Sequence, residues 1–303
     1  MKDFHIPVMF KEVIHYLSIK PGKWYIDCNL GGGGHTQGIL EKGGKILGID
    51  LDPEAIREVA KNYSLEIKEI DGNLEATSDQ LILYQSNFNQ LEKVVQKFQI
   101  SPVLGILFDL GVSSYQLETA ERGFSFNLEA PLDMRMNPNI GATAADLING
   151  LYENELAEIF SKYGEERFAR PIARKIVEER QKKPITTTNQ LAQIILSVRH
   201  RSSKDRTHPA TRVFQALRIA VNDELTSLEQ VLPQALDVLA PGGKLVVISF
   251  HSLEDRIVKN FMQDEYKKGS ITIITQKPVE PEKKEIVTNP RSRSGKLRVT
   301  EKL

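Results

Sequence analysis

The first third of the chain alternates short apolar runs with segments whose apolar residues recur at helical spacing. The short runs predict buried strands, because roughly four to eight apolar residues between turn signals suit a strand. They cover 24–28, 45–50, 80–85 and 103–109. Helical spacing predicts helices over 8–19, stopped by Pro21-Gly22, and over 52–62. This alternation predicts a parallel sheet covered by helices on both faces.

Beyond residue 109 the pattern changes to helical spacing alone, from about 142 to 222. The predicted helices there cover 143–149, 153–163, 166–180, 188–199 and 210–222. Short apolar runs resume at 243–250, 270–275 and 296–300. We interpret the helical block as an insertion into one α/β domain. Two consecutive domains are the alternative, but they would leave three short strands with no sheet to join.

This interpretation places a discontinuous α/β domain at 1–114 and 208–303, and an inserted helical domain at 115–207. Residues 277–290 contain three prolines and many charges. That composition predicts either an extended surface loop or a mobile linker.

Composition fits an ordinary globular protein, with 303 residues, 40% of them hydrophobic and 26% charged. Forty Lys and Arg balance forty Asp and Glu. The zero net charge argues against a protein that coats DNA or anionic membranes non-specifically, since such binding needs excess positive charge. The lone Cys28, the short apolar runs and the absence of an apolar signal core near the N-terminus predict a cytoplasmic protein.

Four consecutive glycines, Gly31 to Gly34, follow the first predicted strand and open a helix. Such turns are common to nucleotide and S-adenosylmethionine sites, because bare backbone N–H groups can approach the ligand. A dinucleotide fingerprint needs glycines at positions n, n+2 and n+5. Counting from Gly31 or Gly32, the third position holds Thr36 or Gln37, so the fingerprint is absent. No Gly-Lys-Ser/Thr ending of a phosphate loop is present either.

Asp50 ends the second predicted strand, where a carboxylate can accept hydrogen bonds from ribose hydroxyls. A role at the start of the next helix is the alternative, because Asp52-Pro53-Glu54 is a strong helix-start signal. The neighbouring glycine turn favours the ligand role. Phe88, just after the third predicted strand, either stacks on an adenine or fills the core.

Nine motifs spread along the chain together resemble one protein family. They are HIPV at 5–8, LGGGGHT at 30–36, DLGVSS at 109–114, ERGFSF at 121–126, PLDMRM at 131–136, YGEER at 163–167, HPATR at 208–212, SFHSLEDR at 249–256 and NPRSRS at 289–294. With these motifs, from His5 to about Arg298, the sequence resembles the bacterial small-subunit ribosomal RNA cytosine-N4 methyltransferases, the RsmH (MraW) family.

This resemblance implies a Rossmann-like class I S-adenosylmethionine-dependent methyltransferase sheet with an inserted all-helical domain for substrate recognition. The implied reaction methylates the N4 amino group of one cytidine, position 1402, in the decoding region of 16S ribosomal RNA. The implied partner is 16S rRNA within the 30S subunit or a late assembly particle, with no membrane. A homodimer is left open by the sequence.

Motif matching also implies a set of site residues. The cofactor-binding set is Gly33, Gly34 and His35 in the first turn, Asp50 at the ribose, Phe88 at the adenine, and Asp109 and Gln116 near the methionine end. Three features depart from the family pattern. Asn29 stands where Thr is expected, Pro171 is expected to interrupt the helix after Arg167, and residues 64–80 are longer and more acidic than usual.

The chemistry requires positioning, because the lone pair of a cytosine amino group is delocalised into the ring. Asp109, at the carboxyl end of the fourth predicted strand, is the candidate catalytic acceptor, and a strand-end turn former is the alternative. An Asp-Pro-Pro-Tyr motif is absent, so attack by an exocyclic amine depends on the resemblance. We expect His35 to act through its backbone, and His251 to touch substrate or to make a structural hydrogen bond. No spacing of histidines or cysteines predicts a metal.

Two basic segments predict where RNA phosphates bind. Residues 199–218 have six basic residues against one acidic residue, and residues 291–303 have five against one. Solvated surface is the alternative for both. The candidate RNA-binding residues are Arg199, Arg201, His208, Arg212, His251, Arg291 and Arg293.

Two other functional classes fit part of the sequence. A nicotinamide-dependent oxidoreductase would explain the glycine turn and Asp50, but it lacks the fingerprint. A non-enzymatic RNA-binding factor with a vestigial cofactor fold would explain the basic segments. It would be expected to lose Gly33, Gly34 or Asp50, and all three are present.

Overall fold

The structure is a computed structural model and describes residues 7–127, 129–139, 141–202 and 207–303. Its internal contacts divide the chain into two compact units. The sheet unit comprises Met1–Gly111 and Leu225–Leu303, and the helical unit comprises Val112–Glu224. The segments of the sheet unit on both sides of the helical unit therefore join one sheet, which excludes two consecutive domains.

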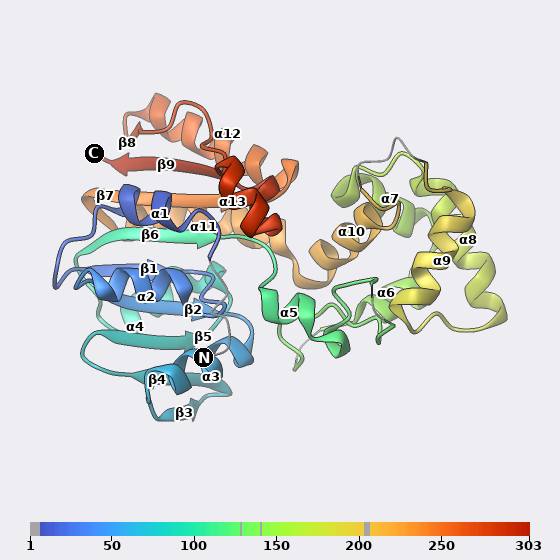
Figure 1. The fold of residues 1–303 in the computed structure, drawn as a ribbon, viewed down its shortest axis with the longest axis horizontal. Helices are drawn as coiled ribbons and strands as arrows, with labels where there is room; N and C mark the ends of the chain where they lie inside the picture. The colour runs from blue at the N-terminus through green and yellow to red at the C-terminus, as the bar shows by residue number, and fades with distance from the viewer. Residues whose placement is uncertain (1–6, 128, 140, 203–206) are drawn as a thin grey trace. The chain divides into compact units, whose positions relative to one another are not determined.

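One mixed sheet forms the centre of the sheet unit (Figure 1). Its strands in the described residues are β1 (Trp24–Asp27), β2 (Lys45–Asp50), β3 (Ile67–Ile70), β4 (Asn73–Thr77), β5 (Leu81–Gln85), β6 (Val103–Asp109), β7 (Leu239–Ser249), β8 (Ile271–Ile273) and β9 (Lys296–Lys302). They lie in the order β3-β4-β5-β2-β1-β6-β7-β9-β8. The five strands from β5 to β7 are parallel, whereas the outer pairs are antiparallel.

The order in which the chain adds parallel strands to the sheet changes direction at β1. From β1 the chain builds toward β2 and β5 on one side, and later toward β6 and β7 on the other. Asp27, the last residue of β1, pairs with Gly48 of β2 and with Leu107 of β6. Ligands of open α/β sheets bind outside the carboxyl ends of the strands at such a switch point.

Helices cover both faces of the sheet, as doubly wound sheets require. One face packs on α1 (Phe10–Leu17), α2 (Gly34–Glu41) and α3 (Pro53–Asn62). The other packs on α4 (Leu91–Lys97), α11 (Glu224–Val238) and α12 (Ser252–Lys268). Because the central strands contact helices on both faces, they are buried and almost continuously apolar.

The helical unit has a hydrophobic core of its own. Its helices are α5 (Ser114–Glu118), α6 (Ala144–Gly150), α7 (Glu153–Gly164), α8 (Ala169–Lys182), α9 (Thr188–Val198) and α10 (Thr211–Asn222). Leu156, Phe160, Ile172, Ile195 and Leu217 are fully buried in it. The predicted fold class, an α/β sheet with an inserted helical region, is confirmed.

The segment 64–80, longer and more acidic than the family pattern, contains the β3–β4 hairpin, which extends the sheet at one edge. Two local expectations are corrected. Residues 277–290 are not a loop throughout, since α13 (Lys283–Thr288) lies within them. Pro171 does not interrupt a helix: α8 begins at Ala169, so Pro171 falls in the first turn, where its missing N–H costs no intrahelical hydrogen bond.

Candidate functional site

Three aspartates end three neighbouring parallel strands at the switch point. Asp27 ends β1, Asp50 ends β2 and Asp109 ends β6. The carboxyl ends of parallel strands meet at one edge of a sheet, so these side chains share that edge. The glycine turn between β1 and α2 lies at the same edge.

The glycine turn has a backbone that only glycine adopts easily. Gly31 and Gly33 have positive φ of 48° and 76°. A Cβ at Gly33 would lie 2.9 Å from Cγ2 of Val59, and one at Gly34 would lie 2.9 Å from Cγ of Pro7. Gly33 is the N-cap of α2, and the first intrahelical hydrogen bond runs from Gln37 N to the Gly33 carbonyl. The N–H groups of the first turn therefore have no intrahelical acceptor and suit an anionic or polar ligand.

The Asp50 carboxylate holds this turn in place. Its Oδ2 accepts a hydrogen bond from Gly31 N at 2.8 Å, and its Oδ1 accepts one from Asp52 N at 2.9 Å. Burial raises the pKa of Asp50 to about 7, although the two backbone donors act in the opposite direction. Asp52, not Asp50, caps α3 through Glu54 N. The N-cap role therefore belongs to Asp52, and each Asp50 oxygen keeps a lone pair for a ligand.

A buried polar cluster lies at the carboxyl ends of β1 and β6, where α2 begins. Asp27 is 1% exposed and accepts a hydrogen bond from Thr36 Oγ1 at 2.9 Å. Burial raises the pKa of Asp27, opposed by the nearby His35 and by the Thr36 hydrogen bond. The Nε2 atom of His35 lies 3.5 Å from Oδ2 of Asp109. The His35 side chain, expected to act only through its backbone, thus also lies beside the candidate catalytic carboxylate.

Several polar atoms at this edge are buried without a hydrogen-bond partner in the described part of the chain. They are Asn29 Oδ1, Asp109 Oδ1, and both ring nitrogens of His35. Buried polar atoms are normally satisfied, and an unsatisfied group calls for an explanation such as a ligand or water. Their clustering beside the glycine turn makes this edge the candidate binding site.

Phe88 lies directly after β5, at the first position of a short 3-10 helix. Its ring is partly buried and packs edge-on against Phe108, with ring centroids 5.8 Å apart. The residue thus contributes to the core, and its partial exposure leaves one side available to a ligand.

Gln116 belongs to the helical unit, unlike the other predicted cofactor residues. Its Oε1 atom accepts a hydrogen bond at 3.0 Å from the backbone N of Ser113, the N-cap residue of α5. This capping box fixes Gln116 within its own unit.

Four of the predicted RNA-binding residues lie in the helical unit. Arg199 pairs with Glu166 at 3.1 Å, whereas Arg201 and Arg212 are exposed. His208 stacks on Phe126, with ring centroids 4.6 Å apart, and burial lowers the pKa of His208, assisted by Arg201. Lys204, Asp205 and Arg206 of the same basic segment lie outside the described residues, as do His5 and Ile6 of the first motif.

The other three lie in the sheet unit. His251 is the N-cap of α12, where its Nδ1 accepts from Glu254 N at 3.4 Å and its backbone N donates to Glu254 Oε2. Arg291 is partly buried and Arg293 is exposed, both in the 3-10 turn Pro290–Ser294.

Sequence reasoning missed Asp27 and Thr36 as site residues. The sequence pattern could have indicated both residues. Asp27 is an acidic residue at the end of the first strand, just before the glycine turn, and Thr36 places a hydroxyl in the first helical turn after it. What the sequence could not show is that this pair is buried and hydrogen-bonded.

The described residues form neither a metal-ligand cluster nor a membrane-crossing helix. No group of three His, Cys, Asp or Glu side chains is arranged to hold a metal ion there. None of the helices in that part of the chain is long and apolar enough to cross a membrane.

Comparison with known proteins gives full-length matches. The model of the MraW methylase family matches residues 2–303. Three curated relatives are each described as ribosomal RNA small subunit methyltransferase H. The protein from Carboxydothermus hydrogenoformans is 45% identical, over 100% of this chain and 99% of its own length. Those from Heliobacterium mobile and Geobacter sulfurreducens are 46% and 48% identical, over 100% and 99% of both chains.

Solved structures give a weaker likeness. A putative rRNA methylase from Clostridium thermocellum aligns with a TM-score of 0.46 at 12% identity, over 98% of both chains. A putative methyltransferase from Streptococcus mutans in complex with SAH aligns with a TM-score of 0.43 at 12% identity, over 97% of both chains. Both scores are below 0.5. The fold is defined by the strand order of the chain itself.

Proposed function

This chain belongs to the MraW methylase family, and we propose that it methylates the N4 amino group of one cytidine in the decoding region of 16S ribosomal RNA. At the coarser level it is an S-adenosylmethionine-dependent ribosomal RNA methyltransferase, like the relatives that match it over its full length. The predicted family, enzyme class and cofactor are confirmed at that level. The target atom and nucleotide are the proposal.

The residues at the switch point fit S-adenosylmethionine. The unsatisfied His35 and Asp109 atoms are buried where the glycine turn offers unused N–H groups. Gly33, Gly34 and His35 would contact the cofactor through this turn, Asp50 would accept from the ribose hydroxyls, and Phe88 would flank the adenine. Gln116 is proposed as a cofactor-binding residue on its motif match alone. When bound, the cofactor supplies a methyl group on a positively charged sulfur.

Asp109 is the proposed catalytic residue. The cytosine N4 atom is a weak nucleophile, and it loses a proton as it gains the methyl group. Asp109 Oδ1 is buried with no protein hydrogen-bond partner in the described residues, so it can accept that proton from N4. His35 lies 3.5 Å from the other oxygen and is proposed to hold the carboxylate in position. Most of the rate enhancement then comes from orientation of N4 toward the methyl group.

The substrate must be an unstacked base, since N4 lies on the pairing edge of cytosine. We propose that Arg199, Arg201, His208 and Arg212 of the helical unit, and His251, Arg291 and Arg293 of the sheet unit, bind the surrounding RNA. The exposure of Arg201, Arg212 and Arg293 supports this assignment. The proposed setting is the bacterial cytoplasm, on the 30S subunit or a late assembly particle, with the protein as a monomer or homodimer.

The observation that carries the proposal is the full-length match combined with the polar switch-point edge. A thermal-shift comparison of S-adenosylhomocysteine with NAD tests the cofactor. At about 100 times its Kd, a ligand that binds only the folded state adds about 2.7 kcal/mol to the free energy of unfolding. We expect a raised Tm with S-adenosylhomocysteine and none with NAD. The reverse pattern would support an oxidoreductase and overturn the proposal.

A further inference from the structure

The first two turns of α8 carry a basic surface that none of the predicted RNA contacts includes. From Arg167 to Lys183 the chain has seven basic and two acidic residues. The buried side of α8 is apolar, through Ile172, Ala173 and Ile176. Helical spacing therefore turns Arg170 and Arg174, one turn apart, to the outside, and both are exposed.

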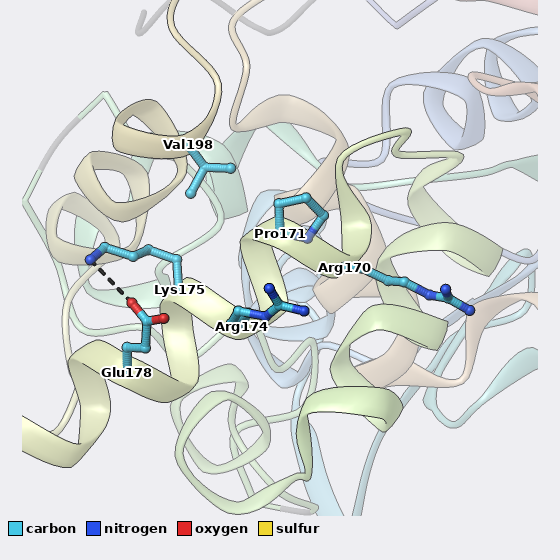
Figure 2. A pocket seen from close by; sticks show the side chains of 6 residues that line it. All are labelled: Arg170, Pro171, Arg174, Lys175, Glu178 and Val198. Carbon is cyan, nitrogen blue, oxygen red and sulfur yellow. Dashed lines mark hydrogen bonds and ion pairs between the residues drawn. The ribbon is translucent and has the colours of Figure 1, made fainter.

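Beside these arginines the surface is hollowed. A cavity of about 300 Å³ is lined by Arg170, Pro171, Arg174, Lys175 and Glu178 of α8 and by Val198 at the end of α9 (Figure 2). Its basic side chains exceed its acidic ones by two. Its apolar lining consists of Pro171 and Val198, so the hollow offers cations beside an apolar wall.

The cations at this hollow differ in how far the protein itself neutralises them. Lys175 is paired with Glu178 at 3.4 Å and with Glu179 at 2.9 Å. Arg174 lies 3.6 Å from Glu153, with 69% of its side chain exposed. Arg167 and Arg170 have neither an ion pair nor a side-chain hydrogen bond within the described ranges. Exposed guanidinium groups without carboxylate partners suit phosphate oxygens, which they bind in bidentate geometry.

An exposed aromatic ring accompanies the arginines. Phe168 is 44% exposed, directly after Arg167 and three residues before Pro171. Proteins that bind single-stranded RNA combine cations along the backbone with aromatic rings on which bases stack. A bare anion site would have no use for the ring.

We infer that this α8 surface, formed by Arg167, Phe168, Arg170 and Arg174, binds the sugar-phosphate backbone of a single-stranded segment of the substrate RNA. The inference depends on the proposed function, which supplies the RNA. Arg170 and Arg174 bind phosphates beside the hollow, and Phe168 stacks on a base. The binding is electrostatic and independent of sequence, so it adds affinity and orientation rather than choice of nucleotide.

The test measures how RNA affinity depends on salt. Each phosphate contact to a single strand contributes about 0.7 to the slope of log K against log salt. Arg170→Gln with Arg174→Gln should lower the slope by about 1.4, which is about 25-fold in affinity at 0.1 M salt if the affinity at 1 M is unchanged. Arg170→Lys with Arg174→Lys should keep the slope. Fluorescence anisotropy with a single-stranded fragment of small-subunit rRNA provides the measurement.

The matched control removes two exposed charges outside this basic segment, through Lys61→Gln with Lys68→Gln in the sheet unit. It should keep the wild-type slope. A second experiment replaces the aromatic ring of Phe168. Phe168→Leu should weaken RNA binding roughly five- to 150-fold, which is the range for loss of one base stack. Phe168→Trp keeps an aromatic ring and should keep the wild-type affinity. The thermal shift with S-adenosylhomocysteine verifies that each variant is folded.

If the double variant Arg170→Gln with Arg174→Gln keeps the wild-type salt slope, the inference is overturned. The same holds if the matched control, in which two other lysines become glutamine, loses as much slope as this variant. These outcomes differ from the result expected if the proposed function is wrong. In that case the wild-type protein itself would not bind or methylate small-subunit rRNA.

Discussion

At the scale of single residues, Asp50 connects the glycine turn to the proposed cofactor site. Its two oxygens accept from Gly31 N and Asp52 N, so the same carboxylate shapes the glycine turn and faces the proposed ribose site. Burial makes this carboxyl group a weaker acid, with a pKa of about 7 that is close to working pH. Binding at this site should therefore depend on pH.

We expect the affinity for S-adenosylhomocysteine to fall as the pH is lowered through 7. The ionised carboxylate is the stronger acceptor for ribose hydroxyls, so a proton on Asp50 competes with the ligand. From pH 8 to pH 6 the ionised fraction of a group with a pKa of about 7 drops about tenfold, and calorimetric Kd values should rise by up to that factor.

Asp50→Asn serves as the control for this titration. It should bind the ligand more weakly at every pH, with a flat profile between pH 6 and 8 and unchanged RNA affinity. A profile in the variant as steep as in the wild type would show that another group titrates. Equal loss of ligand and RNA binding would contradict the ribose role.

Asp109 is the residue whose removal should affect the chemical step most. At saturating cofactor, Asp109→Asn should slow single-turnover methyl transfer by roughly 10²- to 10⁴-fold, because the amide cannot take the N4 proton. Asp79→Asn, which changes an exposed carboxylate before β5, should leave the rate unchanged. If Asp109→Asn reaches the wild-type rate once cofactor is saturating, the residue is a binding group and not the proton acceptor.

At the scale of elements, the turn between β1 and α2 is constrained by packing, in addition to any requirement of the proposed ligand. Gly33 has a φ of 76° and leaves no room for a Cβ beside Val59. Loss of cofactor binding on substitution here can therefore have a structural cause. The two contributions can be separated by stability measurements.

Gly33→Ala should lower the free energy of unfolding by about 1–2 kcal/mol for the left-handed backbone, plus a further amount for the contact with Val59. In a Val59→Ala background only the backbone part should remain. Urea unfolding of the four proteins in this double-mutant cycle gives the coupling. An equal penalty in both backgrounds would show that the Val59 contact contributes nothing.

Elements with strong local signals could be predicted from the sequence. β2 and β6 match the predicted ranges 45–50 and 103–109, because continuous apolar runs mark strands buried on both faces. The β3–β4 hairpin was not predicted, since all four residues of β3 are exposed and the strand has no apolar alternation. Pro171 was misjudged because the start of α8 at Ala169 depends on packing within the helical unit, which periodicity does not reveal.

The site was predictable to the same extent. Motifs identified Asp50, Asp109 and the glycine turn, since each lies at a strand end that the pattern already placed. The proximity of the His35 and Asp109 side chains could not be predicted, because it depends on β1 and β6 being neighbours in the sheet although they are far apart in the sequence.

At the scale of the whole molecule, the zero net charge conceals a strong local separation of charge. The sequence has equal numbers of acidic and basic residues, yet the segment from Arg167 to Lys183 has an excess of five positive charges. A protein of this kind avoids indiscriminate binding to polyanions while local surfaces hold a chosen RNA. The proposed cofactor edge lies in one unit and the proposed α8 surface in the other.

The central claim is that this chain methylates N4 of one cytidine in small-subunit rRNA. The most direct test incubates the protein with labelled S-adenosylmethionine and either 30S subunits or naked 16S rRNA, and then maps the modified nucleotide by mass spectrometry. The account predicts a single N4-methylcytidine in the decoding region. No transfer to either substrate, or label on another atom or another region of the RNA, would contradict it.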